Sequence, residues 1–356
     1  MTRLLPYYHL RRCLPVAACV LILACAGQLS ALGNDRGWTR QPSGTLAWLH
    51  AVYFLDVNRG WAVGGDGALL TTTDGGRNWH KQPRPTEDAL LDVYFSSAEV
   101  GWLVCERSIY LLRTKDEPRA YLLKTVDGGA TWMRVEVTGQ EVDVRLVRIL
   151  FADDERGWVF GEEGALYATR DGGASWSRQR VPTRHLLLGG AFLNQLQGWL
   201  VGAGATVLQT TNSGETWRTG GPVVTTGSPV ARLNGVSFVD GRRGWAVGSG
   251  GLVLATTDGG RSWRAQTSNV AADLFDVKFF DAAEGWAVGA EGTVIHTTDG
   301  GRNWQSEKSD TAHPLERLCF VGRTRGWAVG FGGTIIAYGP ATNSTPPEIK
   351  SSSRRY

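Results

Sequence analysis

The most regularly spaced reactive side chains in this chain are carboxylates in the pattern Thr-x-Asp-x-Gly-x-x-Trp. A carboxylate repeated in this way can act as a catalyst or a calcium ligand, but each copy would then be an equivalent site. An Asp in a Gly-rich turn also accepts hydrogen bonds from the backbone of that turn. We therefore expect each of these residues to stabilise its own hairpin turn, a role that we call a hairpin lock. We expect none of them to be catalytic or to bind a metal. The pattern surrounds Asp74, Asp127, Asp171, Asp258 and Asp299, with a degenerate copy at Asn212.

A second set of charged residues lies inside short apolar segments that resemble strands. If these segments surround a common axis, their charges meet and we expect compensating ion pairs. The alternative is a pair of carboxylates across a channel, the arrangement used in glycoside hydrolysis. The residues concerned are His50, Asp92, Arg148, Asp276, Glu316 and Arg317.

Motifs of known catalytic classes are otherwise absent from the sequence. There is no H-E-x-x-H, no G-x-S-x-G and no phosphate-binding loop. The Arg-Ile-Pro tripeptide typical of sialidases is missing, and no Tyr is distinctively paired with a Glu. We predict a protein that is not an enzyme and that needs no cofactor.

Arginine recurs immediately before a Gly-Trp dipeptide. An arc of guanidinium groups on one face can dock carboxylate-bearing partners, although ordinary solvated turns have the same composition. The candidate partner-binding residues are Arg59, Arg156, Arg243 and Arg325.

The elements that must position these side chains are seven copies of one repeat. From Gly60 onward, Gly-Trp occurs seven times at intervals of 41 to 56 residues, and a Phe stands six residues before each of these glycines. A period near 41 residues accommodates four short strands, which is one propeller blade. We predict an all-β, seven-bladed β-propeller over residues 34–340, followed by a polar tail at 341–356. The tryptophans of the repeat are Trp61, Trp102, Trp158, Trp199, Trp245, Trp286 and Trp327.

The seventh repeat ends without a Thr-x-Asp-x-Gly-x-x-Trp segment. The stretch Asp35–Gln41, with Trp38, resembles the missing strand. We expect it to join the last blade and close the ring, which removes the open sheet edges. Trp48 is the one tryptophan that the repeat leaves unexplained. Two longer loops interrupt the pattern, a hairpin insertion in the second repeat and a linker at Thr219–Val230, and both are candidates for a partner surface.

The first 26 residues have the composition of an export signal. Arginines precede an apolar run that is short for a membrane span, and Ala24–Ala26 offers a cleavage site. Cys25 is a candidate for lipidation, and an uncleaved anchor is the other alternative. Without the three leader arginines, 34 basic side chains balance 34 acidic ones, so charge gives no reason to expect nucleic acid. Cys105 and Cys319 fall in different repeats and are expected to be free thiols.

With the repeat laid out, the chain resembles the photosystem II stability/assembly factors of cyanobacteria and chloroplasts. The match is carried by the F-x5-GWAVG elements, by TTDGGRNW and TTDGGRSW, and by the closing strand, and it covers about Gly33–Gly339. The resemblance implies an exported, non-enzymatic factor that binds newly made reaction-centre polypeptides at the lumenal side of the thylakoid. Members include lipoproteins, and we expect a monomer. An exported propeller that binds or hydrolyses carbohydrate is the second hypothesis.

Overall fold

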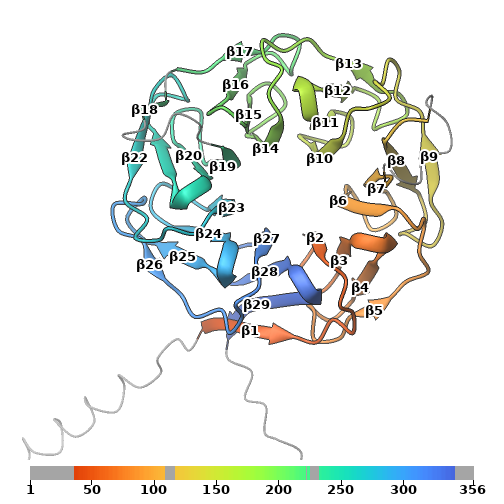
Figure 1. Cartoon of the computed structure of the whole chain (residues 1–356), viewed down its shortest axis with the longest axis horizontal. Coiled ribbons are helices and arrows are strands. Elements are labelled where there is room, and N and C mark those ends of the chain that lie inside the picture. The colour runs from red at the N-terminus through yellow and green to blue at the C-terminus, as the bar shows by residue number, and fades with distance from the viewer. Residues whose placement is uncertain (1–35, 109–116, 222, 225–231, 341–356) are drawn as a thin grey trace, which may run out of the picture. The chain divides into compact units, whose positions relative to one another are not determined.

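The computed structural model describes residues 36–108, 117–221, 223–224 and 232–340, and in these it shows seven small antiparallel sheets around a central axis (Figure 1). The predicted all-β, seven-bladed propeller is confirmed. The predicted leader at 1–26, Cys25 and the tail at 341–356 lie outside the described residues.

The innermost strand of each blade surrounds the axis, and the second and third strands follow outward. The inner strands are β2 (Leu49–Phe54), β6 (Ala89–Phe95), β10 (Leu146–Phe151), β14 (Leu187–Phe192), β19 (Leu233–Phe238), β23 (Leu274–Phe279) and β27 (Leu315–Val321). The second strands are β3 (Gly60–Gly64), β7 (Gly101–Glu106), β11 (Gly157–Gly161), β15 (Gly198–Gly202), β20 (Gly244–Gly248), β24 (Gly285–Gly289) and β28 (Arg325–Gly330). The third strands are β4 (Leu69–Thr72), β8 (Ala120–Thr125), β12 (Leu166–Thr169), β16 (Val207–Thr210), β21 (Val253–Thr256), β25 (Val294–Thr297) and β29 (Thr334–Pro340).

The outer strands are short, and single 3-10 turns link the second strand to the third in five blades. The outer strands are β5 (His80–Lys81), β9 (Met133–Val135), β13 (Ser177–Arg178), β17 (Arg218–Thr219), β22 (Trp263–Gln266) and β26 (Gln305–Ser306). The 3-10 turns are η2 (Gly65–Gly67), η3 (Glu162–Gly164), η4 (Ser249–Gly251), η5 (Ala290–Gly292) and η6 (Phe331–Gly333).

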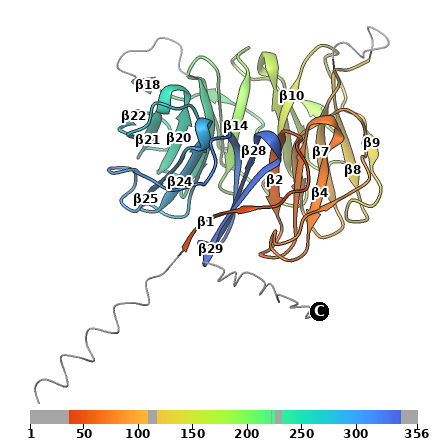
Figure 2. The same cartoon turned by 60° about the horizontal axis from the view of Figure 1, so that its bottom comes forward.

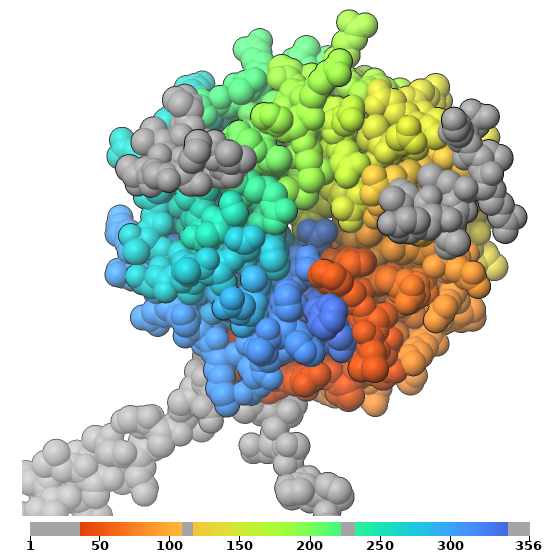
Figure 3. Space-filling model, in the orientation of Figure 1, coloured from red at the N-terminus to blue at the C-terminus, as the bar shows by residue number. Residues whose placement is uncertain are grey.

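The ring closes as the sequence predicted. Strand β1 (Arg36–Gln41) lies along β29 as the outer strand of the seventh blade (Figure 2). Trp38 is buried there, with its ring 5.6 Å from that of Trp286. The space-filling view shows the first blade, in orange, directly beside the last, in blue (Figure 3). Trp38 also lies edge-on to Phe320 at 5.9 Å, as Trp304 does to Phe279 at 5.7 Å, so the N-terminal strand supplies the tryptophan that follows the Asp-bearing turn in the other blades.

The Phe-to-Gly spacing of the repeat follows from the register of the first two strands. Phe54 pairs with Gly60 across β2 and β3, and a Cβ on that glycine would lie 2.5 Å from the Phe54 ring. The same close approach occurs at the corresponding glycine of every blade. Only a residue without a side chain fits beneath the ring, so both residues recur together.

Each Gly-Trp tryptophan packs against the repeat phenylalanine of the next blade. Trp61 stacks on Phe95 with 3.7 Å between ring centroids, and Trp199 on Phe238 with 3.6 Å. Two pairs are tilted instead of stacked, at 4.5 Å for Trp102 with Phe151 and 6.0 Å for Trp286 with Phe320. These aromatic contacts form the core between blades.

The expected hairpin locks are present. In the first blade Asp74 accepts hydrogen bonds from the Thr72 hydroxyl and the Asn78 backbone, and the Gly76 N–H donates to Thr72. Asn212 accepts the corresponding backbone bond from Thr216, so the degenerate copy keeps the fold of the turn. All six turns follow this pattern.

The linker after the fourth blade adds a feature that the sequence did not predict. Val223–Val224 forms β18, a parallel fifth strand on β22 of the next blade. The insertion in the second blade lengthens β7 and β8 to six residues each. Cys105 and Cys319 are free, as expected. No helix among the described residues is long and apolar enough to cross a membrane.

Candidate functional site

Three of the four predicted partner-binding arginines lie in turns and the fourth begins a strand, in the first, third, fifth and seventh blades. The turn before the second strand and the Asp-bearing turn are joined by backbone hydrogen bonds, for example from Gly75 to Asn58, so they share one face, the first face. Arg156 pairs with Asp153 at 3.1 Å and Arg243 with Asp240 at 2.6 Å. Both aspartates also accept hydrogen bonds from backbone N–H groups of their own turn. These contacts are those of ordinary solvated turns, the alternative that the sequence left open.

The other two arginines are held differently. Arg325 begins β28, and its guanidinium lies over Gly339 of β29, where a Cβ would come within 2.8 Å of Nη1. Arg59 forms no ion pair within 4.0 Å among the described residues, although its charge helps the backbone N–H groups of Arg59 and Asn58 to lower the pKa of Asp56. It lines a pocket between the first and second blades, described below.

The channel charges form the predicted ion pairs across the axis. Arg148 of the third blade lies 3.3 Å from Asp276 of the sixth, and Arg317 of the seventh lies 3.7 Å from Asp92 of the second. Asp92 also accepts the N–H of Ile149 at 2.9 Å. All four charged side chains are largely buried, and they link opposite sides of the ring.

Burial governs the protonation of the channel carboxylates. It raises the pKa of Asp92 to about 6, against the opposing charge of Arg148. It also raises the pKa of Asp276, which the charge of Arg148 and the Leu318 N–H counteract. Because each carboxylate interacts with an arginine and accepts a backbone N–H, neither is free to act as a general base.

The ion-pair layer divides the channel into two mouths. Arg148 and Arg317 line a pocket on each side of the layer, so the layer forms the floor of both. The mouth on the first face contains Tyr53, Tyr94 and Lys278. A chain segment that enters one mouth meets this floor.

The mouth on the second face has a volume of about 410 Å³. We call it the Trp48 mouth. Polar and aromatic groups surround its entrance, with an apolar wall beneath. The entrance residues are Trp48, His50, Arg145, Arg232 and Glu316, and the wall consists of Leu91, Val147, Leu188 and Phe275.

Trp48, which the repeat did not explain, is one of the large aromatic side chains that remain exposed, at 43%. Its ring packs edge-on against Phe331, also exposed, with centroids 5.4 Å apart. Leu46 is exposed nearby in the sequence. Exposed aromatic residues beside a pocket are typical anchors at protein interfaces.

The charges of the Trp48 mouth are uneven. Burial, aided by the charge of Arg145, lowers the pKa of His50 to about 4, so this imidazole is neutral near pH 7. Burial raises the pKa of Glu316 despite a hydrogen bond from Trp48. Arg145 bonds Glu106 at 2.8 Å, whereas Arg232 is 46% exposed and 3.8 Å from Asp273. Arg232 is therefore the guanidinium with most freedom to bind a carboxylate.

His50 and Glu316 thus do not join the ion-pair layer, although Arg317, the residue after Glu316, does. No cluster of metal-binding side chains occurs in the described part of the chain. In the sequence, Trp48 was notable only because it is the one tryptophan that does not belong to the repeat. That difference was the one sequence feature that pointed to a special role.

Comparisons with known proteins agree with the repeat and the fold. The family model described as photosynthesis system II assembly factor YCF48 matches residues 33–119, 79–185, 174–269 and 264–339. The chloroplast photosystem II stability/assembly factor HCF136 of Arabidopsis thaliana is 31% identical over 81 residues. That match spans 21% of this chain and about a fifth of the relative (20%).

Two solved structures show the fold. A structure of YCF48 bound to D1 peptide superposes with a TM-score of 0.69 and 20% identity, covering 86% of this chain and 96% of that one. A GH74 xyloglucanase from Xanthomonas campestris superposes with a TM-score of 0.64 and 13% identity, covering 84% of this chain and 53% of that one. Because the family model spans the whole propeller, this chain belongs to the photosystem II assembly factor YCF48 family.

Proposed function

We propose that this protein is an exported, non-enzymatic scaffold that binds a segment of a photosystem II reaction-centre polypeptide in the Trp48 mouth. Membership of the family supports the role, and a fold neighbour is a YCF48 bound to a D1 peptide. The observation that carries the choice of site is an exposed Trp48 and an underused Arg232 around one pocket. In the mouth, Trp48 packs against apolar side chains of the client and Arg232 binds a carboxylate.

The floor of the channel restricts how a client can bind. The layer of Arg148, Asp276, Arg317 and Asp92 blocks passage through the axis. A client therefore enters as a chain end or a turn and does not thread the ring. The neutral imidazole of His50 adds a polar contact without competing for the carboxylate.

The test is calorimetric titration of the full chain, purified in mild detergent, with overlapping peptides that cover the D1 sequence. We expect one or a few peptides to bind, and Trp48→Ala and Arg232→Gln each to weaken that binding tenfold or more, about 1.4 kcal/mol. The matched control is Leu196→Ala, which removes an exposed apolar side chain from a turn on the first face and should leave binding unchanged. Binding that survives both changes would contradict the assignment of the mouth.

The first-face arginines remain the alternative surface for the same client. A quadruple variant, tested with the same peptides, separates the two surfaces. It replaces Arg59, Arg156, Arg243 and Arg325 by Glu. Loss of binding in this variant alone would keep the role and move the site. Failure of every peptide to bind would remove the role itself.

The second hypothesis, a carbohydrate-active propeller, is favoured only by the fold shared with the xyloglucanase. Asp92 and Asp276 are each paired with an arginine, so hydrolysis would lack a free carboxylate pair. We expect no release of sugar from xyloglucan. The remaining parts of the proposal are a lumenal or periplasmic location, a monomeric state and a lipid anchor at Cys25. Mass spectrometry of the purified N-terminus tests the lipid anchor.

A further inference from the structure

Most blade boundaries are sealed in the same way. The Asp-bearing loop of one blade covers the Gly-Trp tryptophan of the blade before it. The indole N–H donates to a glycine carbonyl of that loop from Trp199 to Gly259 at 2.9 Å, from Trp245 to Gly300 at 3.0 Å and from Trp327 to Gly75 at 3.0 Å. At Trp102 and Trp158 the indole N–H has no acceptor, but the loop glycine is so close that a Cβ would lie 2.6 Å from the indole nitrogen, so the loop still covers the ring.

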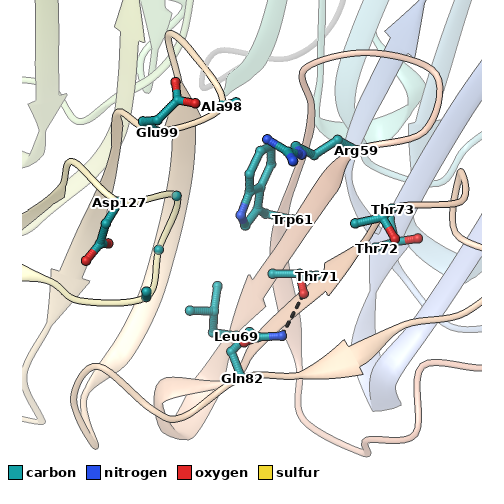
Figure 4. Close-up of a pocket in the computed structure, with 13 residues that line it drawn as sticks. Arg59, Trp61, Leu69, Thr71, Thr72, Thr73, Gln82, Ala98, Glu99 and Asp127 are labelled. Carbon is teal, nitrogen blue, oxygen red and sulfur yellow. Dashed lines mark hydrogen bonds between the residues drawn. The ribbon is translucent and has the colours of Figure 1, made fainter.

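The boundary between the first and second blades lacks this seal. The three atoms nearest to a Cβ at Gly129 all belong to Trp132 of the same loop, and none to Trp61 of the first blade. Trp132 donates to Gly129 within its own loop at 3.1 Å and is only half-buried. Trp61 is 2% exposed, yet its indole N–H has no acceptor. A pocket of about 450 Å³ occupies the gap, and the Trp61 nitrogen points into it (Figure 4).

The third strand contributes Thr71 to this pocket. Thr71 stands opposite Trp61 in the register of β3 and β4. In the second blade the same position holds Lys124, whose Nζ lies 5.1 Å from the Trp102 ring and donates to Gly172 at 2.8 Å. Lys124 thus fills the corresponding space beside Trp102, whereas Thr71 only accepts a hydrogen bond from Gln82 at 2.7 Å. The third, fifth and seventh blades carry Ala at this position and are nevertheless sealed by the loop glycine, so the pocket follows from the position of the Gly129 loop and not from the size of Thr71.

Hydrogen-bond donors and carboxylates lie on opposite walls of the pocket (Figure 4). Arg59 stands above Trp61, and Glu99 and Asp127 lie on the opposite wall (Figure 4). The Asp127 carboxylate is already engaged by the hydroxyls of Thr125 and Thr131. The Trp61 ring and Leu69 give an apolar surface. The pocket therefore offers two unsatisfied donors beside an apolar wall, and two carboxylates face them, of which Asp127 is already hydrogen-bonded within its own turn.

We propose that this pocket is a second peptide site, which binds one acidic side chain of a partner protein. The Asp or Glu carboxylate accepts hydrogen bonds from the Arg59 guanidinium and the Trp61 indole N–H, and its methylene groups pack on Leu69. Glu99 accepts an N–H of the partner backbone and disfavours a second acid. The site is separate from the Trp48 mouth, so it can hold a client or another assembly partner independently.

The experiment follows the Trp61 indole signal by NMR in the full ¹⁵N-labelled chain, with Trp61→Phe to assign it. The probes are the peptides acetyl-Gly-Glu-Gly-amide and acetyl-Gly-Gln-Gly-amide at about 1 to 10 mM, where single-residue contacts bind. We expect a saturable shift with the Glu peptide and at least a tenfold weaker response to the Gln peptide. Thr71→Lys, which introduces the residue type that fills the next boundary, should abolish the shift.

The matched control is Arg156→Gln, which changes an arginine of the same turn type that has no such pocket and should leave the shift unchanged. The other indole signals report whether each variant remains folded. An absent shift, an equal response to both peptides, or a shift that persists in Thr71→Lys would overturn the proposal. A response to a xyloglucan oligosaccharide but not to the peptides would also overturn it. None of these results bears on D1 binding in the Trp48 mouth.

Discussion

Phe54 in the first blade stacks on Trp327 in the seventh, with ring centroids 3.5 Å apart and planes inclined by 9°. Almost the entire propeller separates the two residues in sequence, so their contact exists only when the ring is closed. Both side chains are buried, at 4% and 1% exposure. The contact is the same Trp–Phe pair that joins the other blades, used here for closure.

Removal of this contact should destabilise the closed ring. Phe54→Ala deletes a buried aromatic ring, and we expect the free energy of unfolding in urea to fall by about 3–5 kcal/mol. Phe331→Ala is the matched control, because that ring is 46% exposed, and its cost should be within about 0.5 kcal/mol. Equal losses in the two variants would contradict the role of the stack in closure.

The hairpin locks should depend on the acceptor atom and not on the charge. Asp171 accepts from Thr169, from the Ser175 hydroxyl and from the Ser175 N–H, and Asn212 shows that an amide oxygen serves the same turn. Asp171→Ala should lower the unfolding free energy by about 1–3 kcal/mol, and Asp171→Asn by clearly less. Chemical denaturation at pH 7 measures both, and an equally large loss with Asn would show that the charge matters.

The locks also predict acid sensitivity. Although burial opposes it, hydrogen bonding lowers the pKa of Asp171 and Asp258 to about 2. Because the folded-state pKa lies below that of the unfolded chain, near 4, this stabilisation is present above pH 4 and is lost as the pH falls toward 2. Asp171→Asn should flatten the fall of unfolding free energy between pH 4 and pH 2. An unchanged slope in the variant would count against this pKa shift.

The channel layer predicts the opposite trend. Burial raises the pKa of Asp92 to about 6, so the folded protein binds more protons than the unfolded chain between about pH 4 and pH 6. The contribution of Asp92 to stability therefore falls as the pH rises through this window. Compared with Asp92→Asn, the wild type should lose stability from pH 4 to pH 6 and then remain level. A constant difference between the two proteins at pH 4, 5, 6 and 7 would refute the raised pKa.

The opposing trends reflect two environments of the same residue type. Asp171 lies in an exposed turn and accepts several hydrogen bonds, whereas Asp92 lies in the channel, away from water. The spacing of the turn motif identified the first environment. The environment of Asp92 depends on strands that are distant in sequence and meet at one axis. The sequence could therefore predict that ion pairs form there, but not which residues pair with each other.

The candidate sites were less predictable than the fold. The arginines before Gly-Trp were a regular pattern, but Arg156 and Arg243 proved to be bound to aspartates three residues earlier. Trp48 and Thr71, which line the two proposed sites, belong to no conspicuous motif. Their importance lies in what their neighbours leave uncovered.

The sequence by itself determined the number of blades, the strand that closes the ring, and the structural role of the repeated aspartates. It could do so because each blade uses the same local register, such as Phe54 opposite Gly60, and therefore repeats the same residues. Only the tertiary structure decided that Arg148 meets Asp276, that Arg317 meets Asp92, and that the Trp61 indole has no acceptor. These relationships join different blades, and their distances depend on how the blades pack around the axis.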